Sequence, residues 1–441
     1  MKLKRGTMPD EENSAPIAAD ARRFNLILQL ASLVGLAMLI AWRSHTSPNP
    51  QDFSQFYMGG LMASPGLADE MYPIPHADSI HNPGPAVESD MPPKYARQAQ
   101  RVGVGNSFRF IQPPPTALLF APLSYYSYRV AQMVWLGILT VCAWIAAVQA
   151  GRIYGLLRGV HGGGGRAEGI ITCIATFSPL TYWSIRVQNT SPIVAALIGM
   201  SVLALLENRP ARVALAVVLG GILKYASGIL LPLFIVLRAW RELVLMAVFT
   251  IIVLLITLFA LGRAPFAIFF TDIAPTLSRP FEMEQNQSLA GFLLRITHQV
   301  VLPHALNLAL NLLRWGSLAG LCLLLARRPR LHWQQPCNLI PAAAALLAWL
   351  AVFSPIFWEH YAIYFVPFWG WLIWEIRGGG GGGWRRWVGS AAIALHWGAW
   401  PIWWKHIIPE PACSIMLWGS ICLLLLATVR IAESRAVERA A

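Results

Sequence analysis

The chain has few charged residues. Only 12% of its 441 residues are Asp, Glu, Lys or Arg, whereas 56% are hydrophobic and 19 are Trp. A water-soluble fold of this length could not bury so much apolar surface. The composition therefore excludes an ordinary soluble protein and indicates a chain that resides in a lipid bilayer.

Motifs for several familiar kinds of site are also missing. The six cysteines are scattered without a CxxC pair, so they support neither a disulfide framework nor a zinc site. Two glycine tracts, residues 161–165 and 378–383, follow no predicted strand, and a phosphate-binding loop needs a strand, a loop and then a helix. These tracts are interpreted as linkers. No internal repeat is evident.

Long uncharged runs dominate what is present. Roughly 20 apolar residues cross the hydrocarbon core of a bilayer. About twelve runs approach that length, which predicts an all-α polytopic membrane protein. The short pair 213–223 and 225–237 could be two broken helices or one span. The runs cover residues 24–42, 130–150, 168–183, 192–206, 213–223, 225–237, 242–262, 304–326, 338–354, 361–376, 387–404 and 413–429.

Basic residues set the expected orientation. Lys2, Lys4 and Arg5 precede the first span, and the arginines of the later short connections fall on the same side if twelve spans are counted. Both termini are then cytoplasmic. The net charge of +13 thus comes largely from basic residues that set the membrane topology, and it is no sign of nucleic-acid binding. The first apolar run has no cleavage-site pattern and is interpreted as a retained helix.

One membrane domain is expected, over residues 24–430, between a cytoplasmic N-terminal segment, 1–23, and a cytoplasmic tail, 431–441. Two connections on the extracytoplasmic side are long, at about 44–115 and 263–303. Long loops in a compact protein are usually functional or disordered. We expect these two to carry short interfacial helices.

The first long loop contains an acid among aromatic residues, in the stretch DFSQFYMGG. Phe53, Phe56 and Tyr57 have helical spacing, which predicts a helix lying at the membrane surface with Asp52 at its start. Asp52 followed three residues later by Gln55 also matches a capping box, in which the acid serves only the helix end. Spacing leaves both a capping and a catalytic role open.

Other polar residues fall on the same predicted side. Lys224 lies between two apolar segments, where a cation costs free energy unless it meets an anion or reaches the interface, so it is a site candidate with interfacial snorkelling as the alternative. The remaining candidates are weighed equally against a plain surface loop or an interface anchor. They are Arg279, Arg295, Asn286 and Gln287 in the second long loop, and Glu359 and His360 before the tenth span.

Several stretches together resemble glycosyltransferase family 87, in one consistent order from about residue 24 to 376. Each motif alone is weak, and the order is what makes them specific. The stretches are DFSQFYMGG from Asp52, MYP from Met71, PPPTALLFAPLS from Pro113, VQNTSPIVAAL from Val187, LKYASGILLPLFIVLRAWR from Leu223, NQSLAGFLLR from Asn286 and SPIFWEHYAIYFVP from Ser354.

The resemblance implies a GT-C-type membrane enzyme of the bacterial inner (cytoplasmic) membrane. Enzymes of this kind transfer mannose, or in some cases arabinofuranose, from a polyprenyl-phosphate donor to a glycolipid or glycan acceptor outside the cytoplasm. The resemblance makes Asp52 the expected catalytic base. It gives substrate-binding roles to Gln188, Lys224, Asn286 with Gln287 and Ser288, and His360. Three features depart from the family pattern: Gln112 before the prolines, Tyr361 after His360, and a first loop that is long between Asp69 and Arg109.

The expected chemistry is an inverting displacement in which Asp52 takes a proton from an acceptor hydroxyl. Lys224, Arg279, Arg295 or His360 would neutralise the departing lipid phosphate. The scheme requires no metal and no cofactor beyond the lipid-linked sugar. Two other classes stay open: a transporter or lipid-linked-glycan flippase, and a glycan polymerase or ligase that uses a pyrophosphate lipid.

Overall fold

The protein is all-helical in the part of the chain that the structure describes. The computed structural model describes residues 11–44, 51–72, 92–104, 109–159, 165–327, 333–378, 383–397 and 414–440. Helix accounts for 82% of the structure, and within these ranges there is no strand, only an isolated bridge between Asn286 and Trp358. The predicted all-α class is confirmed.

Six of the described helices are long and apolar enough to cross a membrane, which agrees with a membrane protein. The expected number of about twelve is not confirmed, because the other predicted spans coincide with shorter helices. The six segments are Ala19–Trp42 in α1 (Glu11–Ser44), Tyr128–Leu157 (α5), Trp240–Leu261 (α11), His304–Ala326 (α15), Pro336–Phe353 (α16) and Ile415–Glu433 in α20 (Ile415–Ala440).

The shorter helices arise where caps and prolines interrupt apolar runs. The predicted span 168–183 is broken because Pro179 starts a new helix, whose cap Ser178 accepts a hydrogen bond from the Thr181 backbone N–H at 3.2 Å. The predicted span 387–404 extends past Trp397, outside the described residues. These helices are α6 (Arg166–Thr176), α7 (Pro179–Arg186), α8 (Ser191–Leu206), α9 (Pro210–Leu223), η4 (Tyr225–Leu230), α10 (Leu231–Val236), η7 (Glu359–Phe368), α17 (Trp369–Ile376) and α18 (Gly383–Trp397).

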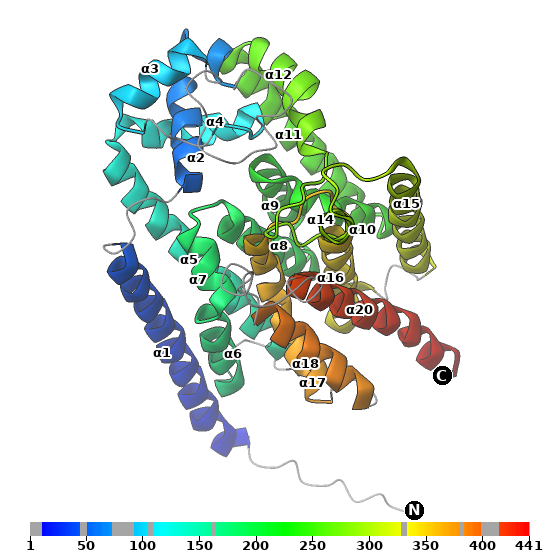
Figure 1. Ribbon diagram of the computed structural model, residues 1–441. Coiled ribbons are helices and arrows are strands. Elements are labelled where there is room, and N and C mark those ends of the chain that lie inside the picture. The colour runs from blue at the N-terminus through cyan, green and yellow to red at the C-terminus, as the bar shows by residue number, and fades with distance from the viewer. Residues whose placement is uncertain are drawn as a thin grey trace, which may run out of the picture.

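The two long loops carry short helices, most of which meet at one end of the molecule (Figure 1). Tyr72 of the first loop contacts Phe269 of the second, with ring centroids 6.1 Å apart, inside a small hydrophobic core of their own. The first loop contributes α2 (Gln51–Met62), η1 (Ala68–Glu70), α3 (Pro93–Arg101), α4 (Pro114–Phe120) and η3 (Ala121–Tyr125), and the second α12 (Ala264–Ile268), η5 (Phe269–Ile273), α13 (Ala274–Leu277) and, farther along the chain, α14 (Leu289–Thr297).

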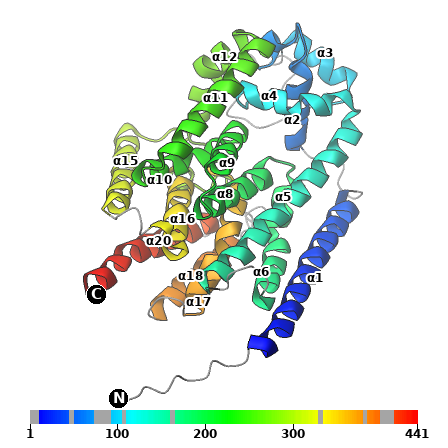
Figure 2. The same ribbon diagram turned by 180° about the vertical axis from the view of Figure 1, so that it is seen from behind.

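Burial separates the core of the bundle from its edges. In α16, 89% of the apolar window is buried, and the run of small residues at 342–345 lets neighbouring helices approach closely. By contrast, α1 and α15 lie at opposite edges of the bundle (Figure 2) and expose Met38 and Leu312, each to 67%. Such apolar exposure suits contact with lipid.

Candidate functional site

The aromatic residues around Asp52 face the protein interior. Phe53 stacks on Trp135 with centroids 6.0 Å apart, and Phe56 stacks on Phe120 at 4.8 Å, and both phenylalanines are fully buried. The helix predicted at this position is therefore present as α2, and its aromatic face packs against other helices of the protein. Helices α5 and α4 supply the stacking partners of these rings, which a membrane surface does not offer.

The Asp52 carboxylate is held from across the fold. It occupies the first turn of α2, and its Oδ2 accepts a hydrogen bond from the Asn189 side-chain amide at 2.6 Å. The proposed capping partner, Gln55, has an Oε1 atom without a hydrogen-bond partner among the described residues. The structure thus favours a tertiary role for Asp52 over a capping box.

A tight turn aims Asn189 at Asp52. Gln188 has a positive φ of 56°, an uncommon conformation for glutamine, and its carbonyl accepts a bond from Trp135 Nε1 at 2.9 Å. The Asn189 Oδ1 atom accepts bonds from the hydroxyls of Thr190 at 3.4 Å and Ser191 at 3.2 Å. With its oxygen so engaged, the Asn189 amide must direct its NH₂ group to the carboxylate.

Lys224 supplies a positive charge near this carboxylate. It follows α9 with an extended backbone, which confirms that the short predicted pair is broken here, and its side chain is only 5% exposed. Its Nζ donates to Ser191 Oγ at 3.1 Å and lies 3.6 Å from the centroid of the Tyr361 ring. We call Asp52, Asn189, Ser191, Lys224 and Tyr361 the Asp52 centre.

The two opposite charges of the Asp52 centre do not touch. Burial lowers the pKa of Lys224 and the Asp52 charge raises it in part, while the Lys224 charge lowers the pKa of Asp52. Among the described residues, no ion pair within 4.0 Å joins Lys224 to Asp52. A base and a cation that remain separate can each serve a different part of a substrate.

The start of η7 adds two buried polar groups. Trp183 Nε1 donates to Glu359 Oε1 at 2.7 Å, and the Ser184 hydroxyl donates to the His360 carbonyl at 2.8 Å. Glu359 Oε2 and His360 Nε2 are buried without a hydrogen-bond partner in the described part of the chain. Unsatisfied buried polar atoms are rare in native proteins and mark places where a ligand can complete the bonding.

The polar residues of the second loop tie that loop to the bundle. Asn286 donates to the Pro355 carbonyl at 3.0 Å and accepts from the Phe357 backbone N–H at 3.0 Å. Gln287 accepts from the backbone N–H of Met416 at 3.2 Å. These contacts are structural, since they fix the segment that leads into η7.

Two predicted phosphate ligands lie outside this arrangement. The Arg295 guanidinium donates to the carbonyls of Met283 and Asn286, both at 2.8 Å, and to Ser414 Oγ. Arg279 is exposed after α13 and makes no side-chain contact with the Asp52 centre in the part of the chain that the structure describes. Of the predicted cations, the structure brings Lys224 close to Asp52, and His360 is near enough to experience the Lys224 charge.

Burial changes the acidity of both carboxyl groups. It raises the pKa of Asp52 above its usual value, although the Asn189 hydrogen bond and the Lys224 charge lower it in part. Burial also raises the pKa of Glu359 to about 7, while the Trp183 bond lowers it and the charge of Glu284 raises it. A raised pKa makes Asp52 a better base towards an alcohol than an ordinary aspartate.

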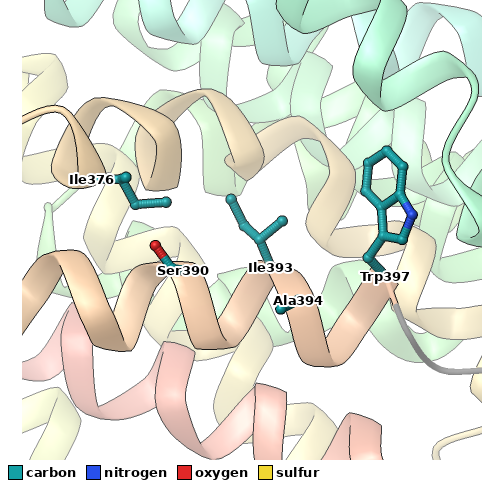
Figure 3. Close-up of a pocket in the computed structure, with 5 residues that line it drawn as sticks. All are labelled: Ile376, Ser390, Ile393, Ala394 and Trp397. Atoms are coloured by element: carbon teal, nitrogen blue, oxygen red, sulfur yellow. The ribbon is translucent and has the colours of Figure 1, made fainter.

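A separate surface pocket lies between α17 and α18. It is lined by Ile376, Ser390, Ile393, Ala394 and Trp397, as Figure 3 shows, and none of these belongs to the Asp52 centre. Its lining holds a single hydroxyl and no ionisable group, so it offers nothing for proton transfer. In the described residues, no group of three or more His, Cys, Asp or Glu side chains could hold a metal ion.

Sequence reasoning missed three members of the Asp52 centre and one neighbour. Asn189 rather than Gln188 faces Asp52, because the turn at Gln188 points its own side chain to Gln132 at 3.3 Å. Ser191 lies in the same VQNTSP stretch, so the motif pointed to the right segment. Tyr361 stood out only as a departure from the family pattern, and Trp183 gave no signal.

The family model for glycosyltransferase family 87 matches residues 110–355, more than half of the 441-residue chain. That range includes Asn189, Ser191 and Lys224, although Asp52 and Tyr361 lie outside it. No curated protein and no solved structure matches the chain. The chain belongs to glycosyltransferase family 87.

Proposed function

We propose that the protein is an inverting glycosyltransferase that moves one sugar, with mannose favoured, from a polyprenyl-phosphate donor to an envelope glycolipid or glycan. The reaction takes place on the extracytoplasmic face of the bacterial inner membrane, with both termini in the cytoplasm. The observation that carries the proposal is the Asp52 centre, in which a carboxylate fixed by Asn189 lies near a buried cation without pairing with it.

The donor class follows from where the reaction occurs. Nucleotide sugars are confined to the cytoplasm, so a sugar used outside must arrive on a lipid. Each buried CH₂ group contributes about 0.8 kcal/mol to membrane binding, so a polyprenyl chain stays in the bilayer and the enzyme must meet it there. Edges such as α1 and α15, which expose apolar side chains, are suited to that environment.

Asp52 acts as the general base. Its Oδ2 is held by Asn189 at 2.6 Å, so the other oxygen is available to an acceptor hydroxyl. The acceptor oxygen attacks the anomeric carbon as its proton passes to Asp52, and the bond from that carbon to the phosphate oxygen breaks. The electron pair leaves with the lipid phosphate. A single displacement inverts the anomeric configuration.

Lys224 stabilises the leaving group. The departing phosphate gains negative charge as the bond breaks, and a nearly buried ammonium interacts with that charge more strongly than an exposed one would. Glu359 and His360, with their open hydrogen-bonding atoms, bind sugar hydroxyls beside it. The proposed roles of Arg279, Arg295, Gln188, Asn286 and Gln287 are then indirect, as residues that shape the surrounding loops.

The test is transfer by purified protein in proteoliposomes supplied with polyprenyl-phosphate mannose and a bacterial membrane-lipid extract. We expect acceptor lipids heavier by one hexose, and no product from a nucleotide sugar. Passage of the donor across the bilayer without consumption would indicate a flippase. Transfer of a whole oligosaccharide from a pyrophosphate lipid would indicate a ligase. Either outcome would overturn the proposal.

A further inference from the structure

Tyr361 is fixed beneath Lys224 by its own neighbours. Its ring stacks on Tyr364 with centroids 5.6 Å apart, and it meets Phe357 and His360 edge-on at 5.7 Å and 4.7 Å. Its backbone N–H donates to the Trp358 carbonyl at 2.8 Å, at the start of η7. The ring is therefore a rigid surface and not a side chain that adapts to its partner.

The ammonium of Lys224 lies on this surface. A distance of 3.6 Å from Nζ to the ring centroid is well within the range of about 6 Å in which a cation is attracted to an aromatic face. The attraction is strongest where water is excluded, and Lys224 is only 5% exposed. Together with the bond to Ser191, the ring fixes where the positive charge lies.

Without such contacts, Lys224 and Asp52 would attract each other directly. Opposite charges near a protein interior interact far more strongly than in water, so a buried lysine free to move would pair with the nearest carboxylate. That pair would occupy both the base and the cation at once. In the structure, Asn189 binds the carboxylate, while Ser191 and Tyr361 contact the ammonium.

We propose that Tyr361 is a positioning residue whose ring keeps Lys224 apart from Asp52, so that the lysine stays free to bind the phosphate of the lipid donor. The inference rests on the proposed function for the identity of the phosphate. It also gives a role to the residue that departs from the family pattern. The ring is what matters, because the contact is made by the aromatic face.

The experiment measures binding of undecaprenyl phosphate, which carries no sugar, to the purified full-length protein and its variants. Uncharged undecaprenol is the matched probe. We expect Tyr361→Leu to weaken phosphate binding roughly tenfold and to leave undecaprenol binding unchanged. Tyr361→Phe keeps the ring and should retain wild-type binding. Tyr125→Leu, at a tyrosine that is 89% exposed, is the matched control and should bind as the wild type does.

A double substitution isolates the mechanism. If the leucine variant loses affinity because Asp52 captures Lys224, then adding Asp52→Asn should restore phosphate binding to the level of Asp52→Asn alone. Wild-type affinity in Tyr361→Leu, or equal losses in Tyr361→Phe and Tyr361→Leu, would overturn the inference.

A different outcome of the same experiment would overturn the proposed function. Equal binding of undecaprenyl phosphate and undecaprenol by the wild-type protein would show that no lipid phosphate is recognised, and it would overturn both proposals. A normal preference for the phosphate that Tyr361→Leu leaves unchanged would overturn only the inference about Tyr361.

Discussion

Two clusters of buried charge in this protein are built in opposite ways. In the first, which we call the Glu375 cluster, Arg430 Nε lies 3.4 Å and Arg385 Nη1 lies 4.0 Å from the two oxygens of Glu375, and Arg385 also pairs with Glu433. Its charges contact one another. In the Asp52 centre the opposite charges are near each other but are bound by neutral groups.

Under the proposed function, this difference separates a structural cluster from a reactive one. Opposite charges that contact each other neutralise each other, and here they join helices α17, α18 and α20. Charges that are held apart remain available to a substrate, and holding them apart requires additional residues. We therefore expect substitutions in the Glu375 cluster to change stability, and those in the Asp52 centre to change catalysis.

Apart from replacement of Asp52 itself, the largest effect is expected from Lys224→Met. Loss of the buried cation removes stabilisation of the leaving phosphate, and kcat/KM for sugar transfer should fall about 10²-fold to 10³-fold. Lys94→Met, at a half-exposed lysine paired with Asp69 and Glu70, is the control and should leave transfer unchanged. Equal losses in the two variants would show that Lys224 has no specific role in transfer.

A large effect of a different kind is expected from Glu375→Gln. The Glu375 side chain is buried, and its neutralisation leaves Arg385 and Arg430 without their shared anion. Breaking a buried pair costs roughly 3 kcal/mol, so the melting temperature in detergent should drop clearly. Activity per folded molecule should persist. A variant that is stable but inactive would place this cluster in the reaction.

A smaller effect should follow from Asn189→Ala, and it should depend on pH. The Asn189 bond lowers the pKa of Asp52, so its removal raises that pKa further. Because Asp52 acts deprotonated, the acid limb of the kcat/KM profile should move to higher pH, with most activity recovered in alkaline buffer. An unshifted limb with uniformly low activity would mean that Asn189 does not tune Asp52.

The smallest effect is expected from Asp69→Asn. Asp69 is an acid in the same long loop as Asp52, but its side chain is 56% exposed and pairs with Lys94 at 3.0 Å. Exposed ion pairs contribute little to stability, so both the melting temperature and sugar transfer should stay close to wild type. Loss of transfer here would show that the loop acts as a whole and not through Asp52.

Local sequence patterns predicted the helices well where an apolar run ended at a cap or a charge. The runs 242–262 and 304–326 correspond to α11 and α15 within two residues. The sequence patterns failed where a helix cap and a proline divided an apolar run, as at Ser178 and Pro179. They also failed to show which way the face of α2 points, because an aromatic helix face suits both a membrane surface and a protein interior.

The site was predictable by segment but not by side chain. Asp52 and Lys224 became candidates because charge is rare in this chain and costly among apolar residues. Asn189 contacts Asp52 in place of the predicted Gln188 because Gln188 has a positive φ angle, which the sequence does not reveal. The contact of Lys224 with Tyr361 joins residues far apart in the chain, and no spacing rule relates them.

The most direct test of the account is sugar transfer by Asp52→Asn in proteoliposomes, compared with wild type and Asp69→Asn at equal amounts of folded protein. The account predicts that Asp52→Asn binds undecaprenyl phosphate but transfers no detectable sugar, because the substituted amide cannot accept the proton. Turnover near that of wild type would contradict the assignment of Asp52 as the base and, with it, the proposed mechanism.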